Sequence, residues 1–69
     1  MAFKKTPLED VMTEIEEVYD IHVDFKTPAA RSRTLTGTFS VDSIDVVLSQ
    51  IALAMDVSIH RDGRTVVVR

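Results

Sequence analysis

The segment from Leu8 to Val23 reads LEDVMTEIEEVYDIHV and decides the fold, because a related segment follows later in the chain. Residues 44–59 read IDVVLSQIALAMDVSI, and a shift of 36 residues aligns the two segments without a gap. Nine of the ten apolar residues between positions 3 and 25 then fall on apolar partners, among them Ile15 on Ile51. Such a repeat indicates one supersecondary unit used twice. We expect two strand–helix–strand units that bury their helices against each other.

Each copy predicts an amphipathic helix, because its apolar residues recur at helical spacing. The first helix is expected over residues 7–19, where Thr6 can cap it and Glu9 can reach back as in a capping box. The second is expected over residues 43–55, with Asp42 as its candidate cap.

The two predicted helices differ in their outward faces. Acidic residues fill the outward side of the first helix, namely Glu9, Asp10, Glu14, Glu16 and Glu17. In the second helix Val46, Leu53 and Ala54 widen the apolar stripe instead. A helix that is apolar around more of its circumference is usually the more deeply buried one, and we expect this of the second helix.

The strands are predicted from alternation of apolar and polar residues. Residues 21–25 and 34–39 alternate in this way, and the polar stretch 26–33 between them is expected to be a connection. After the second helix, Asp62-Gly63 is the dipeptide of a two-residue type I′ hairpin. That turn would pair Ile59 with Val66 and leave a C-terminal strand beyond it.

The size and charge of the chain limit the classes of protein to which it can belong. Sixty-nine residues make one domain, residues 1–69, and the predicted fold class is α+β: two βαβ repeats plus a C-terminal strand. Eight Lys and Arg against eleven Asp and Glu give a formal charge of −3, which disfavours a nucleic-acid partner. The longest apolar run, Ile51 to Met55, is too short for a membrane segment. Without cysteine the chain has no disulfide framework.

The charge is unevenly distributed along the chain. Through Asp24 seven acidic residues face Lys4 and Lys5, a local charge of −5, whereas the remainder carries six basic and four acidic residues, a local charge of +2. This asymmetry can orient a partner, although a solvated surface of mixed charge is the simpler interpretation.

The sequence offers no convincing catalytic, metal-binding or cofactor-binding residues. His22 and His60 are the only imidazoles, and both occupy polar strand positions without the spacing of a metal motif. The acidic helix face is solvated, whereas catalytic carboxylates need burial or close contact to shift their pKa values. We therefore expect no enzyme and no cofactor. A small hydrolase or metal-binding protein, the alternative from another class, would require a deep pocket or a bound ion.

The final strand supplies the candidate interaction residues. Val67 falls on the hairpin face opposite Val66 and Val68. If this strand lies at the edge of a sheet, its unpaired backbone can accept a strand from a partner. Thr65, Val67 and Arg69 are then the residues expected to contact that partner.

Five segments carry a family resemblance: residues 3–11 (FKKTPLEDV), 19–23 (YDIHV), 35–39 (LTGTF), 44–48 (IDVVL) and 63–68 (GRTVVV). With the order βαβ–βαββ, they resemble the short domain at the N-termini of secretins and TonB-dependent transporters. The chain is more similar still to the C-terminal domain of FecR-type anti-sigma regulators, especially those of Bacteroidetes. The resemblance covers nearly the whole chain, mostly at positions that define the fold.

The resemblance implies a periplasmic protein-interaction domain of an inner-membrane-anchored regulator, with two helices between two small sheets. Its implied partner is the signalling domain of an outer-membrane TonB-dependent transporter. A sigma factor would be contacted only through a cytoplasmic region that these residues do not include. The alternative within the same fold is the N-terminal signalling domain of a transporter or secretin itself.

Overall fold

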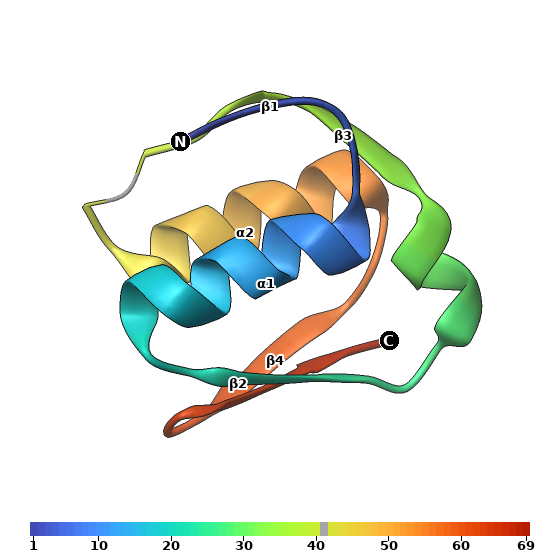
Figure 1. Ribbon diagram of the computed structural model, residues 1–69. Coiled ribbons are helices and arrows are strands. Elements are labelled where there is room, and N and C mark those ends of the chain that lie inside the picture. The colour runs from blue at the N-terminus through green and yellow to red at the C-terminus, as the bar shows by residue number, and fades with distance from the viewer. Residues whose placement is uncertain (41) are drawn as a thin grey trace.

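The computed structural model describes residues 1–40 and 42–69. Within those ranges the chain forms five strands, two α-helices and one short 3₁₀-helix, coloured along the chain in Figure 1. The elements are β1 (Ala2–Pro7), α1 (Leu8–Tyr19), β2 (His22–Phe25), η1 (Pro28–Ser32), β3 (Thr34–Thr38), α2 (Ile44–Met55), β4 (Ile59–Asp62) and β5 (Thr65–Val68).

The two α-helices lie side by side between two small sheets (Figure 1). One sheet pairs β1 with β3 in antiparallel orientation, and the other has the order β2-β5-β4. In the latter, β5 runs parallel to β2 and antiparallel to β4. The predicted α+β fold with the order βαβ–βαββ is confirmed. Both sheets combine strands from the two repeats, so neither repeat has a complete sheet of its own.

The repeat is visible in the backbone as well as in the sequence. The helices α1 and α2 have 12 residues each, and each ends at an aspartate in the left-handed conformation, Asp20 with φ 54° and Asp56 with φ 53°. After each aspartate the next amide bonds back to the helix: Ile21 N–H donates to the Glu16 carbonyl, and Val57 N–H to the Ala52 carbonyl. The left-handed residue turns the chain out of the helix toward the following strand.

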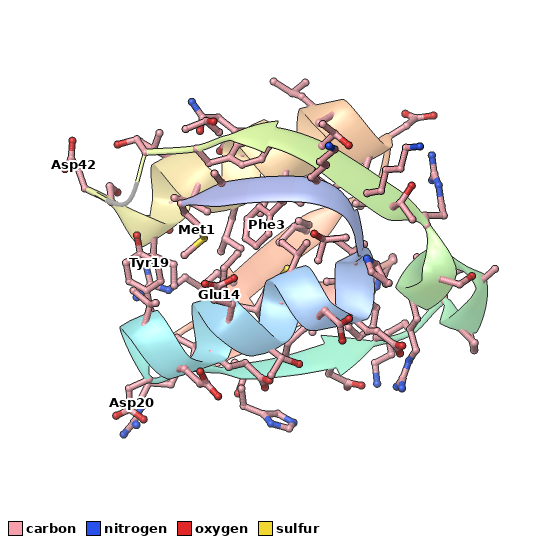
Figure 2. The ribbon with its side chains drawn as sticks, turned by 45° about the horizontal axis from the view of Figure 1, so that its top comes forward. Met1, Phe3, Glu14, Tyr19, Asp20 and Asp42 are labelled. Atoms are coloured by element: carbon pink, nitrogen blue, oxygen red, sulfur yellow. The ribbon has the colours of Figure 1, made fainter. Side chains whose placement is uncertain are left out.

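The core is a single apolar cluster between the sheets. Phe3 of β1 and its repeat counterpart Phe39 pack with ring centroids 6.2 Å apart, and Figure 2 shows Phe3 between its sheet and the helices. Gly37 lies directly beside the Phe39 ring, where a Cβ atom would come within 3.3 Å. In residues 1–40 and 42–69, thirteen apolar residues are buried: Phe3, Leu8, Val11, Met12, Ile15, Ala30, Leu35, Val47, Leu48, Ile51, Met55, Val66 and Val68.

The predicted helix caps are wrong. The residue before α1 is Pro7 and the residue before α2 is Ser43, and neither makes a side-chain capping hydrogen bond. At α1 the physical reason is a backbone contact from elsewhere in the fold. The Arg33 carbonyl accepts the hydrogen bond of the Leu8 N–H at 2.7 Å, so a backbone carbonyl rather than a capping side chain satisfies this donor at the start of the helix.

The prediction that α2 is the more deeply buried helix is also wrong. Each helix buries four residues, and Val46 and Leu53 of α2 are 46% and 85% exposed. The two sheets and α1 cover only one side of α2, which leaves the widened part of its apolar stripe in solvent. This uncovered apolar face needs an explanation beyond the core.

The hairpin register differs from the prediction by two residues. Asp62 pairs with Thr65 and Ile59 with Val68, so the two-residue turn is Gly63-Arg64 rather than Asp62-Gly63. Gly63 has a φ of 60°, whereas Arg64 is not among the positive-φ residues, a combination found in type II′ rather than type I′ turns. Because a shift of two residues keeps every side chain on its face, the hydrophobic pattern cannot distinguish the two registers.

Asp56 offers a test of the left-handed turn that ends α2. Replacement of this exposed aspartate by valine should lower the free energy of unfolding by about 1–2 kcal/mol, because a β-branched residue is strained at positive φ. Asp56→Gly, which removes the same carboxylate without the strain, should unfold close to the wild type. Urea denaturation measures both variants. Equal losses for valine and glycine would mean that the carboxylate matters rather than the backbone.

Candidate interaction surface

The predicted interaction residues lie on β5, which is the central strand of its sheet and not an edge. On one side β2 occupies its backbone: His22 N–H donates to the Arg64 carbonyl at 2.7 Å and Lys26 N–H to the Val68 carbonyl at 2.8 Å. On the other side Arg69 and Ser58 exchange two backbone hydrogen bonds. The prediction that a partner strand pairs with β5 is therefore wrong.

The side chains of Thr65, Val67 and Arg69 point to the outer face of the sheet, away from the helices. Thr65 and Arg69 are exposed, and Val67 is half-buried. Because β5 is paired on both sides, only these side chains can contact a partner. Their part in an interaction stays a prediction.

The β2 edge of the three-stranded sheet is capped by a side chain. Val23 N–H points away from β5 and donates to the Glu16 carboxylate at 2.9 Å. Glu16 comes from the last turns of α1, and α1 contacts β2. A carboxylate in that place occupies the donor that an added strand would use.

The β4 edge is open. Ser58 and Arg69 form a pair that exchanges two backbone hydrogen bonds. Because such pairs recur at every second residue of an antiparallel ladder, the backbones of His60 and Asp62 also bond toward β5. Ile59 and Arg61 are the residues between, and their N–H and C=O groups point away from the sheet. In the part of the chain that the structure describes, these four groups have no hydrogen-bond partner.

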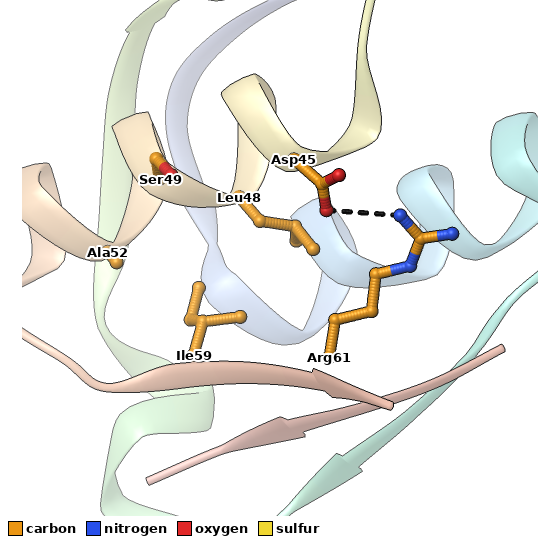
Figure 3. Close-up of a pocket in the computed structure, with 6 residues that line it drawn as sticks. All are labelled: Asp45, Leu48, Ser49, Ala52, Ile59 and Arg61. Carbon is orange, nitrogen blue, oxygen red and sulfur yellow. Dashed lines mark hydrogen bonds and ion pairs between the residues drawn. The ribbon is translucent and has the colours of Figure 1, made fainter. Parts of the chain in front are cut away.

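A cavity of about 220 Å³ lies between this edge and α2. Figure 3 shows its walls: Asp45, Leu48, Ser49 and Ala52 from the helix, and Ile59 and Arg61 from β4. At one end the Arg61 guanidinium donates to the Asp45 carboxylate at 3.0 Å. A second cavity of about 270 Å³ is lined by Ser58, Ile59, His60 and Arg69 at the other end of the strand.

The charged groups are concentrated away from α2. Exposed carboxylates cover the outward face of α1, including Glu14, which is labelled in Figure 2. In α2 Asp45 is the only charged residue. Elsewhere Arg64 pairs with Asp20, and Lys26 pairs with Asp24 at 2.9 Å. The hydrogen bond from Lys26 lowers the pKa of the Asp24 carboxyl below its ordinary value.

The structure does not bring the two histidines together. His22 is on β2 and His60 on β4, with β5 between them. His22 approaches Glu16, with 3.9 Å between its Nδ1 and the carboxylate. Among the described residues, no group of three potential ligands could hold a metal ion, and no polar or charged residue is buried. Over the same ranges no helix has the length and hydropathy of a membrane span.

Two sheets around a pair of helices, an apolar interior and an open sheet edge define a small α+β domain whose chemistry is confined to its surface. The model of the family "FecR, C-terminal" matches residues 1–68, and the chain belongs to that family of anti-sigma regulator domains. The resemblance noted in the sequence is thereby confirmed.

Two solved structures share the fold. A Parabacteroides distasonis protein described as an anti-sigma factor has a TM-score of 0.86 and 17% identity, over 100% of this chain and 32% of that one. A chain of the Salmonella SPI-1 type III secretion injectisome basal body, built from InvG, PrgH and PrgK, has a TM-score of 0.84 and 16% identity, over 99% and 14%. The present chain thus spans a third or less of each. A search of curated protein sequences found no significant match.

The capped β2 edge can be tested through Glu16. Glu16→Ala removes the acceptor of the Val23 N–H, so this amide should exchange with solvent about tenfold faster and unfolding should become easier by about 1 kcal/mol. Amide hydrogen exchange followed by NMR gives the rate. Glu17→Ala removes an exposed carboxylate next door and should leave the Val23 amide unchanged. Unchanged exchange in the Glu16 variant would contradict the capping role.

The Lys26–Asp24 pair predicts a pH effect. A carboxyl whose pKa is lower in the folded than in the unfolded state stabilises the fold above about pH 4, and this contribution is lost as the pH falls through the lowered value. In Lys26→Met the Asp24 pKa should rise toward its ordinary value and the acid-dependent loss should shrink. Carboxyl NMR titration measures the pKa, with Lys4→Met as the control. An unchanged Asp24 pKa in Lys26→Met would assign the shift to other neighbours.

Proposed function

We propose that this chain is the periplasmic protein-interaction domain of a FecR-like anti-sigma regulator, and that it senses the signalling domain of an outer-membrane TonB-dependent transporter. In this function the domain is the receptor-sensing end of a cell-surface signalling pathway. Contact with the sigma factor belongs to a cytoplasmic region of the regulator. The role is regulatory binding rather than catalysis.

The observation that carries the proposal is the family match over residues 1–68 combined with the way the fold uses its residues. The buried residues of the described chain are all apolar, so the interior has no groups for chemistry. Both cavities lie at the surface, beside a strand whose backbone is open on one side. These features favour recognition of another protein over binding of a small molecule.

A second candidate is the N-terminal signalling domain of a transporter or a secretin. The fold shared with the Salmonella basal-body chain supports this candidate. At 16% identity, that likeness concerns the fold alone. Such a domain would occupy the opposite side of the same kind of contact. The two candidates therefore predict different binding partners for one purified chain.

Isothermal titration of this chain with recombinant domains tests the proposal. The signalling domains of TonB-dependent transporters from the same genome should include one that binds with one-to-one stoichiometry at micromolar concentrations. The paired sigma factor should not bind. Binding to FecR-type periplasmic domains instead would favour the second candidate, and direct binding to the sigma factor would overturn the proposal.

A further inference from the structure

We propose that the open edge of β4 and the adjoining cavity beneath α2 bind an extended segment of a partner protein. The segment would add as a fourth strand to the β2-β5-β4 sheet, with apolar side chains toward α2 and acidic residues at its ends. We call this surface the β4–α2 groove, defined by Asp45, Leu48, Ser49, Ala52, Ile59 and Arg61. The inference rests on the proposed function only in taking the domain to be a protein-binding module.

The internal repeat identifies the β4 edge as the altered copy of a capped edge. A shift of 36 residues places Val23 on Ile59 and Glu16 on Ala52. In the first repeat the Glu16 carboxylate accepts the Val23 N–H at 2.9 Å. In the second repeat the alanine methyl group at position 52 cannot accept the Ile59 N–H, and Ala52 lines the groove instead. The residue that blocks one edge is therefore missing at the other.

The backbone groups on the β4 edge have the spacing that an added strand requires. Ile59 and Arg61 both direct an N–H and a C=O away from β5, and His60 between them bonds toward it. An incoming strand would pair with these four groups and continue the ladder.

The groove fits the side chains of such a strand. Alternate residues of an added strand would point toward α2, where the cavity of about 220 Å³ has Leu48, Ala52 and Ile59 in its walls. Leu53, which follows Ala52 along the helix, is 85% exposed, and between Ile44 and Met55 only Asp45 carries a charge. A strand with apolar residues on its inward face would cover this surface and remove it from water.

The charges near the two ends of the β4 edge favour an acidic occupant over a second copy of the chain. Arg61 lines the β4–α2 groove near one end of the edge, and Arg69 lines the separate second cavity near the other end, on the outer face of the sheet. The Arg61–Asp45 pair is partly solvated, so it contributes little and can exchange for a carboxylate of the partner. The segment from residue 25 onward carries a formal charge of +2, and a second copy would bring the same arginines to the contact.

A synthetic peptide tests the edge without any assumption about the natural partner. We choose a short peptide of alternating valine and threonine with glutamate at each end, and a matched peptide with lysine at each end. In NMR titrations the first peptide should shift the Ile59 and Arg61 amides most and leave the capped Val23 amide in place. The lysine peptide should bind about tenfold more weakly. Absence of binding by the glutamate peptide at millimolar concentration would overturn the proposal.

Two substitutions of Arg61 distinguish the contribution of its backbone N–H to peptide binding from that of its side chain. Arg61→Pro removes the outward N–H without breaking the β4–β5 ladder, and Arg61→Ala removes the same side chain but keeps the N–H. We expect Arg61→Pro to weaken peptide binding by about tenfold relative to Arg61→Ala, as loss of one hydrogen bond implies. Equal affinity of the two variants would overturn strand addition. Circular dichroism confirms that each variant is folded.

Ala52→Glu places at the β4 edge the same residue type as Glu16, which caps the β2 edge. This variant provides a test that does not depend on the folding of the proline variant. The new carboxylate should slow exchange of the Ile59 amide and weaken peptide binding by at least about tenfold. Gln50→Glu adds the same charge at an exposed position of α2 and should bind like the wild type. Unimpaired binding by Ala52→Glu would contradict the proposal.

The same variants distinguish this inference from the proposed function. If the transporter's signalling domain binds wild type and Ala52→Glu equally, the groove is overturned while the proposed function stands. If the peptide binds the β4 edge but no signalling domain binds the chain, the strand-addition proposal is supported and the proposed transporter partner is contradicted. Dimerisation of the free chain that Ala52→Glu abolishes, seen by analytical ultracentrifugation, would assign the edge to a second copy and overturn the acidic-partner proposal.

Discussion

Strand pairing between the two repeats is the constraint on which the structure depends. Among the described residues, β1 of the first repeat pairs with β3 of the second and with no other strand, and β2 of the first is held by β5 at the end of the chain. A single repeat would consist of one helix with two unpaired strands and could not remove its apolar stripe from water. Pairing across the repeats completes both sheets at once, and the two helices are buried between them.

The extra strand β5 gives the two repeats different surroundings. It lies between β2 and β4, which are equivalent strands in the repeat, but it runs parallel to one and antiparallel to the other. Its odd-numbered residues bond to β4 and its even-numbered residues to β2, which satisfies its backbone on both sides. The equivalent strands thereby become the two edges of one sheet. A difference between Glu16 and Ala52 then suffices to make one edge closed and the other open.

The helices and the general architecture could be predicted from the sequence because they depend on periodicity over many residues. Spacing at 3.6 residues placed both helices within a residue of their observed bounds, and the repeat indicated how they pair. The capping of α1 could not be predicted, because its acceptor is the Arg33 carbonyl, which the fold brings from a distant segment. Burial of α2 was overestimated, because periodicity does not reveal how many layers will cover a helix.

The location of the open edge could not be predicted, because it depends on the hairpin register. A closing pair of Arg61 and Arg64 would direct the backbone of Ile59 toward β5, whereas the observed closing pair of Asp62 and Thr65 directs it outward. Both registers bury the same valines, so the apolar pattern cannot distinguish one register from the other. The aligned pair of Glu16 and Ala52 was visible in the sequence as a mismatch, but its meaning required the contact between Glu16 and Val23.

An open edge creates a risk of self-association, and the composition of β4 bears on how the domain tolerates it. The strand has only four residues, and His60, Arg61 and Asp62 follow one another along it. A short strand with consecutive polar side chains is a poor template for a second copy of itself, since charged groups of each copy would have to be desolvated together. A partner strand with complementary carboxylates would offset part of that cost through the attraction to Arg61. The residues that suppress self-pairing would therefore also favour the proposed partner segment over a second copy of the chain.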